Sequence, residues 1–287
     1  MVTLKRARRT SGIGSNSNPL ALSSLTNVGA YGDHRWMELY RELGTYSYDT
    51  HIFKSDEPPN VYRKGWEWTQ TIWGLERLNM LQPHHRAVGV GAGRECVIFW
   101  LGDHLRQVVA TDLYGNEQWS RQGGQEADDA VLTNPQAFCP RSIREDVIEF
   151  QTMDGTDLSY YEDATFDISW SLSSIEHFGS HTRSGDAVRE MARVVRSGGV
   201  VVIATELLLL PDQSHAEYFN REEFEVNVLN ASPELELIEP MDWALPPPEY
   251  LIDSIVVPQG VDRTRRHVVL NDGQVQWTSA LVFFRKR

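Results

Sequence analysis

The chain has 287 residues, of which 41% are hydrophobic, so it is long enough to bury one substantial core as a globular protein. Its formal net charge of -13 at pH 7 argues against nucleic acid as a partner, because such binding normally requires a basic face. No apolar run approaches the roughly 20 residues that span a bilayer, and the two cysteines make no disulfide framework, so we expect a cytoplasmic protein without a membrane segment.

The N-terminal part of the sequence predicts a polar tail followed by helical structure. Residues 1–25 contain basic residues but no apolar signal core, so we expect a mobile tail there. Residues 26–82 are expected to form an N-terminal helical cap, in which the apolar spacing predicts a helix over Asn60–Leu81. Within it, the aromatic and cationic side chains of Tyr62–Trp68 are candidates to close over a ligand, although tryptophans more often serve packing.

Strands alternate with helices from residue 83 onward. Apolar periodicity and glycine stop signals predict helices over Cys96–Leu105 and Asp186–Arg196. Short apolar runs predict strands at Ala87–Val90, Val108–Ala110, Val147–Gln151, Phe166–Ser171 and Val200–Ala204. This alternation predicts an α/β fold with a mostly parallel sheet and helices on both faces.

The C-terminal part of the sequence departs from this alternation. Asn220–Glu223 resembles a capping box that opens a helix. Leu235–Ile238 and Trp277–Phe284 are strand-like and predict an antiparallel C-terminal strand pair, with a hairpin turn at Asn271–Gly273. Two long polar stretches, residues 113–144 and 244–266, are expected to be insertions within a single domain over residues 83–287.

Candidate ligand-binding residues follow successive strands. Gly91 and Gly93 follow the first strand, where glycine lets a ligand approach the backbone. Asp112 ends the second strand and is suited to accept hydrogen bonds from both ribose hydroxyls, while Asp154 follows the third and is suited to an adenine amine. Since parallel sheets bind ligands beyond the carboxyl ends of their strands, these residues predict a nucleoside-containing cofactor.

A glycine turn and a ribose-binding acid fit two kinds of cofactor. Nicotinamide dinucleotides use the same pair of features, so an NAD(P)-dependent oxidoreductase is the alternative interpretation. However, Glu95 stands where the following helix begins, and its charge would repel a pyrophosphate at that position. A dinucleotide also leaves Asp154 without a role, whereas a cofactor with a sulfonium cation and no phosphate tolerates acidic neighbours.

Four ordered motifs resemble those of the class I S-adenosylmethionine-dependent methyltransferases. They are Val88–Glu95, Asp154–Leu158 leading into Phe166-Asp167, Ser171–Phe178, and Arg189–Gly199 followed by Val200–Ile203. The resemblance covers about residues 87–206 and implies a Rossmann-like sheet with S-adenosylmethionine as cofactor. Members usually carry an acid at the position of Gly89 and a glycine at that of Glu95, so the methionine end of the site is atypical.

The resemblance also implies which residues contact the cofactor. Its motif positions, together with their neighbours, are Gly89, Gly91, Gly93, Glu95, Asp112, Leu113, Asp154, Gly155, Thr156, Ser171 and Leu172. Tyr114 is a further candidate for packing on adenine, with ordinary surface packing as the alternative.

His177 is the first candidate for a general base, because it follows the fourth strand and histidine titrates near neutrality. Glu176 is a second catalytic candidate and His181 a reserve, with helix capping or cofactor contact as alternatives for His177. The same residues do not predict a metal site, because Gly179 interrupts the helix and no third ligand follows at a telling spacing.

The acidic charge and the insertions favour methyl transfer to O or N of a small-molecule or glycan-like acceptor over a nucleic-acid substrate. A third hypothesis is a cofactor-binding module without catalysis. The acceptor, the methylated atom and the oligomeric state are left open by the sequence.

Overall fold

The computed structural model describes residues 18–49, 51–53, 59–116, 127–257 and 265–287. Its α-helices are α1 (His34–Gly44), α2 (Arg63–Arg77), α3 (Cys96–His104), α5 (His181–Val194), α6 (Arg221–Phe224) and α7 (Pro248–Ile252). Shorter turns are η1 (Val28–Gly32), η2 (Asp129–Leu132), η3 (Pro135–Phe138), η4 (Ile175–His177) and the π-helical η5 (Glu225–Leu229). The strands are β1 (Ser24–Leu25), β2 (Arg86–Val90), β3 (Gln107–Asp112), β4 (Ile148–Thr152), β5 (Phe166–Leu172), β6 (Val195–Leu208), β7 (Leu235–Leu237), β8 (Ile255–Val256), β9 (Leu270–Asn271) and β10 (Gln276–Lys286).

The strands form one sheet in the order β4-β3-β2-β5-β6-β10-β9-β8. From β4 to β6 neighbouring strands run parallel, whereas β10 runs antiparallel to β6. Strand β7 also pairs antiparallel with β10, with Leu237 opposite Phe284. The predicted α/β class, the mostly parallel sheet and the antiparallel C-terminal strand pair are confirmed.

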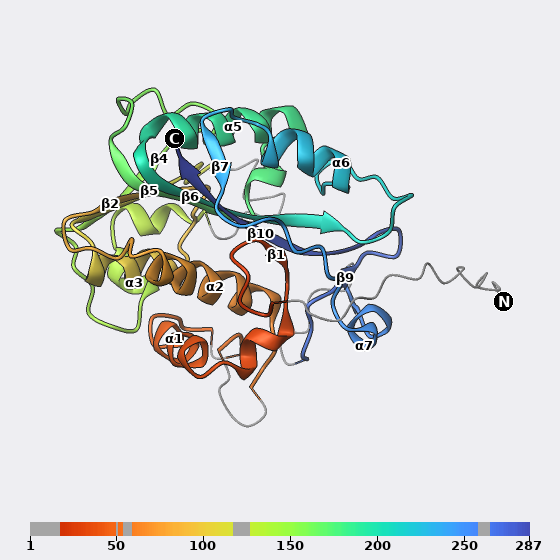
Figure 1. Ribbon diagram of the computed structural model, residues 1–287. Helices are drawn as coiled ribbons and strands as arrows, with labels where there is room; N and C mark the ends of the chain where they lie inside the picture. The colour runs from red at the N-terminus through yellow and green to blue at the C-terminus, as the bar shows by residue number, and fades with distance from the viewer. Residues whose placement is uncertain (1–17, 50, 54–58, 117–126, 258–264) are drawn as a thin grey trace, which may run out of the picture.

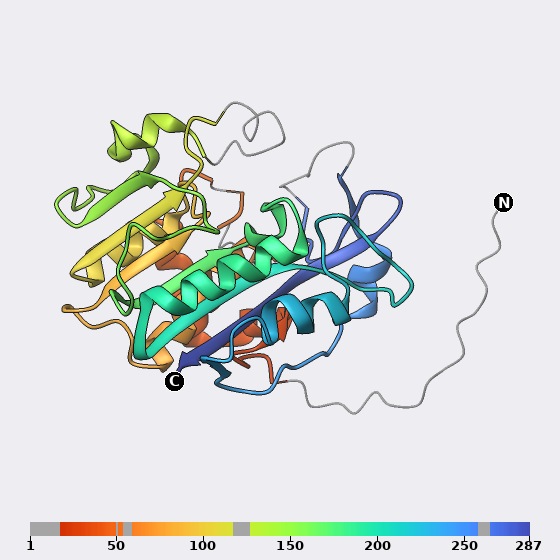
Figure 2. The same cartoon turned by 90° about the horizontal axis from the view of Figure 1, so that it is seen from above.

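Helices cover both faces of this sheet. Figure 1 shows α1, α2 and α3 below the strands and α5 and α6 above them, and Figure 2 shows the second pair from above. Successive side chains of a strand point to opposite faces, so Phe283 of β10 packs with the lower layer and Phe284 with the upper one. Helix α2 approaches β10 so closely that a Cβ on Gly74 would lie 2.2 Å from the Phe283 ring.

Several element boundaries differ from the sequence expectation. Helix α5 begins at His181 rather than at Asp186, because the Ser180 side chain caps it by accepting a hydrogen bond from Arg183 N at 3.2 Å. The capping box at Asn220–Glu223 is present, and the turn Asn271–Gly273 joins β9 to β10 as predicted.

The predicted mobile tail, residues 1–25, includes residues that are part of the folded structure. Ser24–Leu25 form β1, which pairs with β10, and Leu22 is buried. The reason is the open edge of β10: β9, β1 and β7 pair with successive stretches of it and so cover its backbone groups. Residues 1–17 of the expected tail lie outside the described residues.

The segment 26–82 contains α1 and α2, as its helical prediction requires. Trp36 of α1 and Trp66 of α2 belong to the same hydrophobic core as Ala87 of β2 and Phe283 of β10. One core therefore joins these helices to the sheet. That they form a separate cap with a boundary at residue 82 stays a prediction.

The two long insertions are partly described. Residues 127–144 contain η2 and η3, and residues 244–257 contain α7 and β8, while 117–126 and 258–264 lie outside the described residues. Among the described residues, we find no helix with the length and apolar character that crossing a membrane requires.

Candidate active site

Two adjoining cavities lie at the carboxyl ends of β2, β3 and β5. The larger has a volume of about 800 Å³ and the smaller about 230 Å³. Gly91, Asp112 and His177 line both of them. Three residues that the sequence singled out separately thus meet at the junction of the two cavities.

The turn after β2 adopts a backbone that glycine favours. Gly91 has φ +62° and Gly93 has φ +50°, both in the left-handed region. A Cβ on Gly91 would also lie 2.0 Å from Ser174 Oγ, in the loop after β5. Two separate features therefore favour glycine at position 91: its dihedral angle and the close approach of the loop after β5.

Asp112 holds the glycine turn in place. Its Oδ2 accepts a hydrogen bond from Gly93 N at 2.9 Å, and its Oδ1 accepts one from Leu113 N at 2.7 Å. Tyr114 lies beneath the turn, buried, with its hydroxyl donating to Gly93 O. Tyr114 lines neither cavity, so the structure does not support its suggested packing on adenine and gives it a supporting role instead.

The smaller cavity combines apolar walls with a second carboxylate besides that of Asp112. Its lining includes Leu113, Met153, Gly155, Phe178 and Asp154. The carboxylate accepts hydrogen bonds from Thr156 N at 2.9 Å and from Arg183 Nη2 at 2.9 Å. Partial burial opposes its ionisation, but the Thr156 hydrogen bonds and the Arg183 cation outweigh this effect and lower the pKa of Asp154.

Three residues of the predicted cofactor set do not reach either cavity. Gly89 lies inside β2, where a Cβ would meet the Trp170 ring at 2.5 Å, so it serves packing. Ser171 is fully buried within β5, and Thr156 turns its hydroxyl to Asp154. The motif match predicted all three as cofactor contacts. For Ser171 the prediction fails because side chains alternate along a strand, and only one side of β5 can open to the cavity.

The remaining predicted residues do line the cavities. The larger is lined by Gly91, Gly93, Glu95, Asp112, Leu172 and His177, and the smaller by Gly91, Asp112, Leu113, Asp154, Gly155 and His177. The structure therefore brings the motif residues of four strand ends to one continuous hollow.

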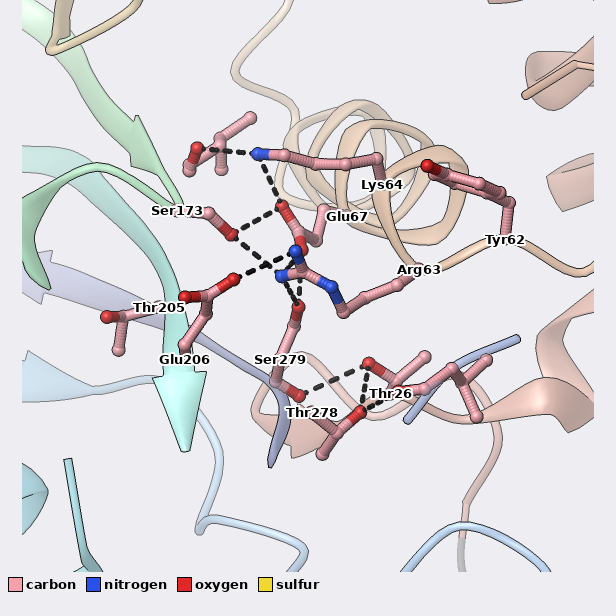
Figure 3. A network of polar contacts seen from close by, with 12 residues as sticks. Thr26, Tyr62, Arg63, Lys64, Glu67, Ser173, Thr205, Glu206, Thr278 and Ser279 are labelled. Atoms are coloured by element: carbon pink, nitrogen blue, oxygen red, sulfur yellow. Dashed lines mark hydrogen bonds and ion pairs between the residues drawn. The ribbon is translucent and has the colours of Figure 1, made fainter. Parts of the chain in front are cut away.

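A buried ionic network (Figure 3) adjoins the larger cavity, which two of its members, Lys64 and Ser173, line. Arg63 donates to Glu67 Oε1 at 2.8 Å and pairs with Glu206 Oε1 at 2.9 Å. Ser173 donates to Glu67 Oε2 at 2.9 Å, and Ser279 Oγ also hydrogen-bonds Glu67. The side chains of Arg63 and Glu67 are 9% and 0% exposed, so these charges are stabilised by one another rather than by water.

Lys64 extends this network to the start of α3. Its Nζ donates to Leu172 O at 2.9 Å and lies 3.1 Å from Glu67 Oε2 and 3.7 Å from Glu95 Oε1. Burial opposes its charge, but Glu67 and Glu95 outweigh this effect and raise the pKa of Lys64. Lys64 and Glu95 therefore place one positive and one negative group together on the cavity wall.

His177 is positively charged at neutral pH in this arrangement. Burial alone would lower its pKa, but the hydrogen bond with Glu217, whose Oε2 lies 3.3 Å from Nδ1, and the nearby carboxylates raise the pKa to about 9. An imidazolium cannot accept a proton, so the charge state disfavours His177 as a simple general base at pH 7.

Glu176, the second catalytic candidate, lies under the cavity and not on its wall. It is fully buried, and Thr205 Oγ1 donates to its Oε2 at 2.9 Å. Burial and the charge of Glu206 raise the pKa of Glu176 to about 7. His181, the reserve candidate, contacts Glu217 O and Glu223 and lines neither cavity.

Sequence reasoning missed several residues of the cavity walls. These are Tyr46, Tyr48, Arg94, Phe138, Met153, Ser173, Ser174, Phe178, Arg183, Glu217 and Tyr218. Ser174 and Phe178 lay within a recognised motif and could have been found from it. Tyr46, Phe138 and Glu217 come from segments outside the motifs, so only the fold brings them to the site.

Comparison with known proteins agrees with the methyltransferase resemblance of the central part of the sequence. Residues 87–203 match a family model described as a methyltransferase domain. The structure is similar to that of the [4+2]-cyclase SpnF at 15% identity, with a TM-score of 0.53 over 87% of this chain and 91% of that chain. This likeness shows the fold alone.

Two further solved structures are similar at lower TM-scores. The YcgJ protein from Bacillus subtilis shares 15% identity over 74% of this chain and 97% of that chain, with a TM-score of 0.47. Geranyl diphosphate methyltransferase, solved in complex with SAM, shares 17% identity over 77% and 86%, with a TM-score of 0.46. The comparisons give no support to the nicotinamide-dependent alternative.

Proposed function

Because the chain is a class I S-adenosylmethionine-dependent methyltransferase, we propose that it transfers the methyl group to an oxygen or nitrogen of a small-molecule or glycan-like acceptor. The observation that carries this proposal is the larger cavity, which continues beyond the glycine turn. Its volume of about 800 Å³ lies within the range of small-molecule binding sites.

The cofactor is assigned to the junction of the two cavities. Its adenine would occupy the smaller cavity between Leu113 and Phe178, and its ribose would contact Asp112. The methionine end would then lie in the larger cavity, where Glu95 faces the ammonium group and Lys64 the carboxylate. The paired opposite charges of these two side chains suit an amino acid, which carries both charges itself.

The acceptor is assigned to the outer part of the larger cavity. Tyr46, Tyr48, Trp68 and Phe138 contribute aromatic side chains to this wall. Arg94 lies 5.0 Å from the centre of the Phe138 ring, and such cation–π pairs stabilise the positions of aromatic side chains. A wall of aromatic rings with polar edges fits a compact organic acceptor and not the backbone of a nucleic acid.

Transfer is an in-line displacement at the methyl carbon, and the sulfonium is already a good leaving group. The protein contributes mainly by aligning the acceptor and excluding water. His177, charged and hydrogen-bonded to Glu217, would donate a hydrogen bond to the acceptor, whose proton leaves through Glu217 or solvent. The role of these two residues is part of the proposal.

The test uses the full chain, S-adenosylmethionine and a panel of alcohols, phenols, amines and sugars. Formation of S-adenosylhomocysteine and a methylated product is measured by mass spectrometry. We expect turnover with a member of this panel and none with DNA or RNA. Turnover with nucleic acid alone would contradict the proposed acceptor class, and cofactor binding without any turnover would favour a cofactor-binding module without catalysis.

A further inference from the structure

A group of metal-ligating side chains lies beside the larger cavity. One ligand atom each from Glu176, His177 and Glu206 lies within 4.8 Å of the others. Two of the residues belong to the loop after β5 and the third to β6, so the fold and not the local sequence brings them together. An imidazole with two carboxylates is a donor set that divalent transition metals accept.

The second observation concerns the unused oxygen of Glu176. The side chain is fully buried, and Oε2 accepts a hydrogen bond from Thr205 Oγ1, while Oε1 has no hydrogen-bond partner among the described residues. A buried carboxylate oxygen without a donor is unfavourable, because it has lost its water and gained no partner. A cation between Glu176 and its neighbours would supply the missing partner.

The charges around this group point the same way. Glu67, Glu95, Glu176, Glu206 and Glu217 are the carboxylates in contact with the network, Arg63 and Lys64 are its permanent cations, and His177 adds a positive charge when it is protonated. Arg63 binds Glu206 through Oε1, so Glu206 would bind the metal through its other carboxylate oxygen. One divalent cation would reduce the excess of negative charge.

The surroundings of His177 match those of a metal-bound histidine. Its Nδ1 lies 3.3 Å from Glu217 Oε2, and such a carboxylate contact fixes the ring so that its second nitrogen faces a metal. Metal binding replaces the proton on the imidazole. The ring also lines both cavities, so an ion could enter from solvent.

We propose that Glu176, His177 and Glu206 form a binding site for one divalent metal ion beneath the wall of the larger cavity, which His177 lines. With the ion bound, His177 no longer donates a hydrogen bond to the acceptor, and the ion orients the hydroxyl or amine instead; this use rests on the proposed function. His181, which the sequence suggested as a neighbour of this pair, is directed to Glu223 and takes no part. The binding site itself does not depend on methyl transfer.

The test is a titration of the metal-stripped full chain with Mn²⁺, in which electron paramagnetic resonance measures the free ion. We expect one Mn²⁺ per chain. Glu176→Gln should weaken Mn²⁺ binding by at least about tenfold. Loss of an outer-shell partner already weakens metal binding by about 10–100-fold, and loss of a direct ligand should weaken it at least as much. Glu222→Gln, on the exposed surface of α6, is the matched control and should bind as the parent does.

A second variant, His177→Ala, keeps the test decisive if Glu176→Gln does not fold, which circular dichroism will show. Absence of Mn²⁺ binding up to about 1 mM, or equal affinity in the parent and in a folded variant, would overturn the proposal. Because the titration contains no cofactor or acceptor, a negative result leaves the proposed methyl transfer standing. Conversely, Mn²⁺ binding without product formation would contradict only the proposed function.

Discussion

The glycine turn offers the sharpest test of how the cofactor site is built. Gly91→Ala introduces a Cβ at φ +62°, which costs an L-residue about 1–2 kcal/mol. The same Cβ would lie 2.0 Å from Ser174 Oγ and 2.8 Å from Ser174 Cβ. Relieving this overlap requires movement of the loop after β5, and overpacking of this kind typically costs a further 1–3 kcal/mol.

The two contributions can be separated by a matched control. Gly273 has φ +91°, and a Cβ there would meet nothing within 4 Å. Gly273→Ala therefore reports the dihedral cost alone, about 1–2 kcal/mol. We expect Gly91→Ala to reduce the free energy of unfolding by about 1–3 kcal/mol more than Gly273→Ala does, as measured by urea denaturation.

Cofactor affinity provides the second readout of the same pair. Gly91 lines both cavities, so its substitution should weaken S-adenosylmethionine binding by at least about tenfold in calorimetry, equivalent to about 1.4 kcal/mol. Gly273→Ala lies at a hairpin away from both cavities and should leave the affinity unchanged. Equal losses of stability in the two variants, with unchanged affinity in both, would refute the close-packing argument for Gly91.

Three further predictions follow from named contacts. Asp112→Ala should weaken S-adenosylmethionine binding by at least about tenfold in calorimetry, because it removes the ribose acceptor and the anchor of the glycine turn; unchanged affinity would remove Asp112 from the site. Gly74→Ala should lower the urea midpoint although alanine favours helices, because its Cβ would meet the buried Phe283 ring, whereas Gly185→Ala, with its nearest contact at 3.4 Å, should not. Since the pKa of Asp154 is lowered in the fold, its contribution to stability is present above the ordinary pKa of 3.8 and is lost as pH falls through the folded value; Asp154→Asn should therefore flatten the acid side of a plot of unfolding free energy against pH.

The sequence was sufficient where backbone chemistry determines the outcome. Apolar runs that alternate with helical segments predicted the parallel strands. The positions of Gly91, Gly93 and Asp112 after successive strands predicted that these three residues lie together at the carboxyl ends of the strands. Glycines with positive φ and a carboxylate at a strand end have few alternative uses in that order. These features depend on residues close together in the chain, which is why they could be predicted without coordinates.

Motif positions were less informative about side-chain direction. Gly89 and Ser171 occupy positions of recognised motifs, yet both face the packed interior of the sheet. Leu172, one residue further along, lines the larger cavity. The pleat alternates direction at each residue, so an error of one position in locating the strand end exchanges a lining residue for a buried one.

The buried charges were the least predictable part of the site, for a physical reason. Arg63 and Glu67 stand four residues apart in a predicted helix, a spacing that normally indicates a solvent-exposed ion pair. In the structure, the first turn of α2 lies against the ends of β5 and β6, and the pair becomes buried together with Glu206. Burying ions is costly and seldom improves stability over apolar packing. The stability of the fold therefore does not account for a network of this size beside the cavity, whereas the binding of polar and charged groups that we propose for the site would account for it.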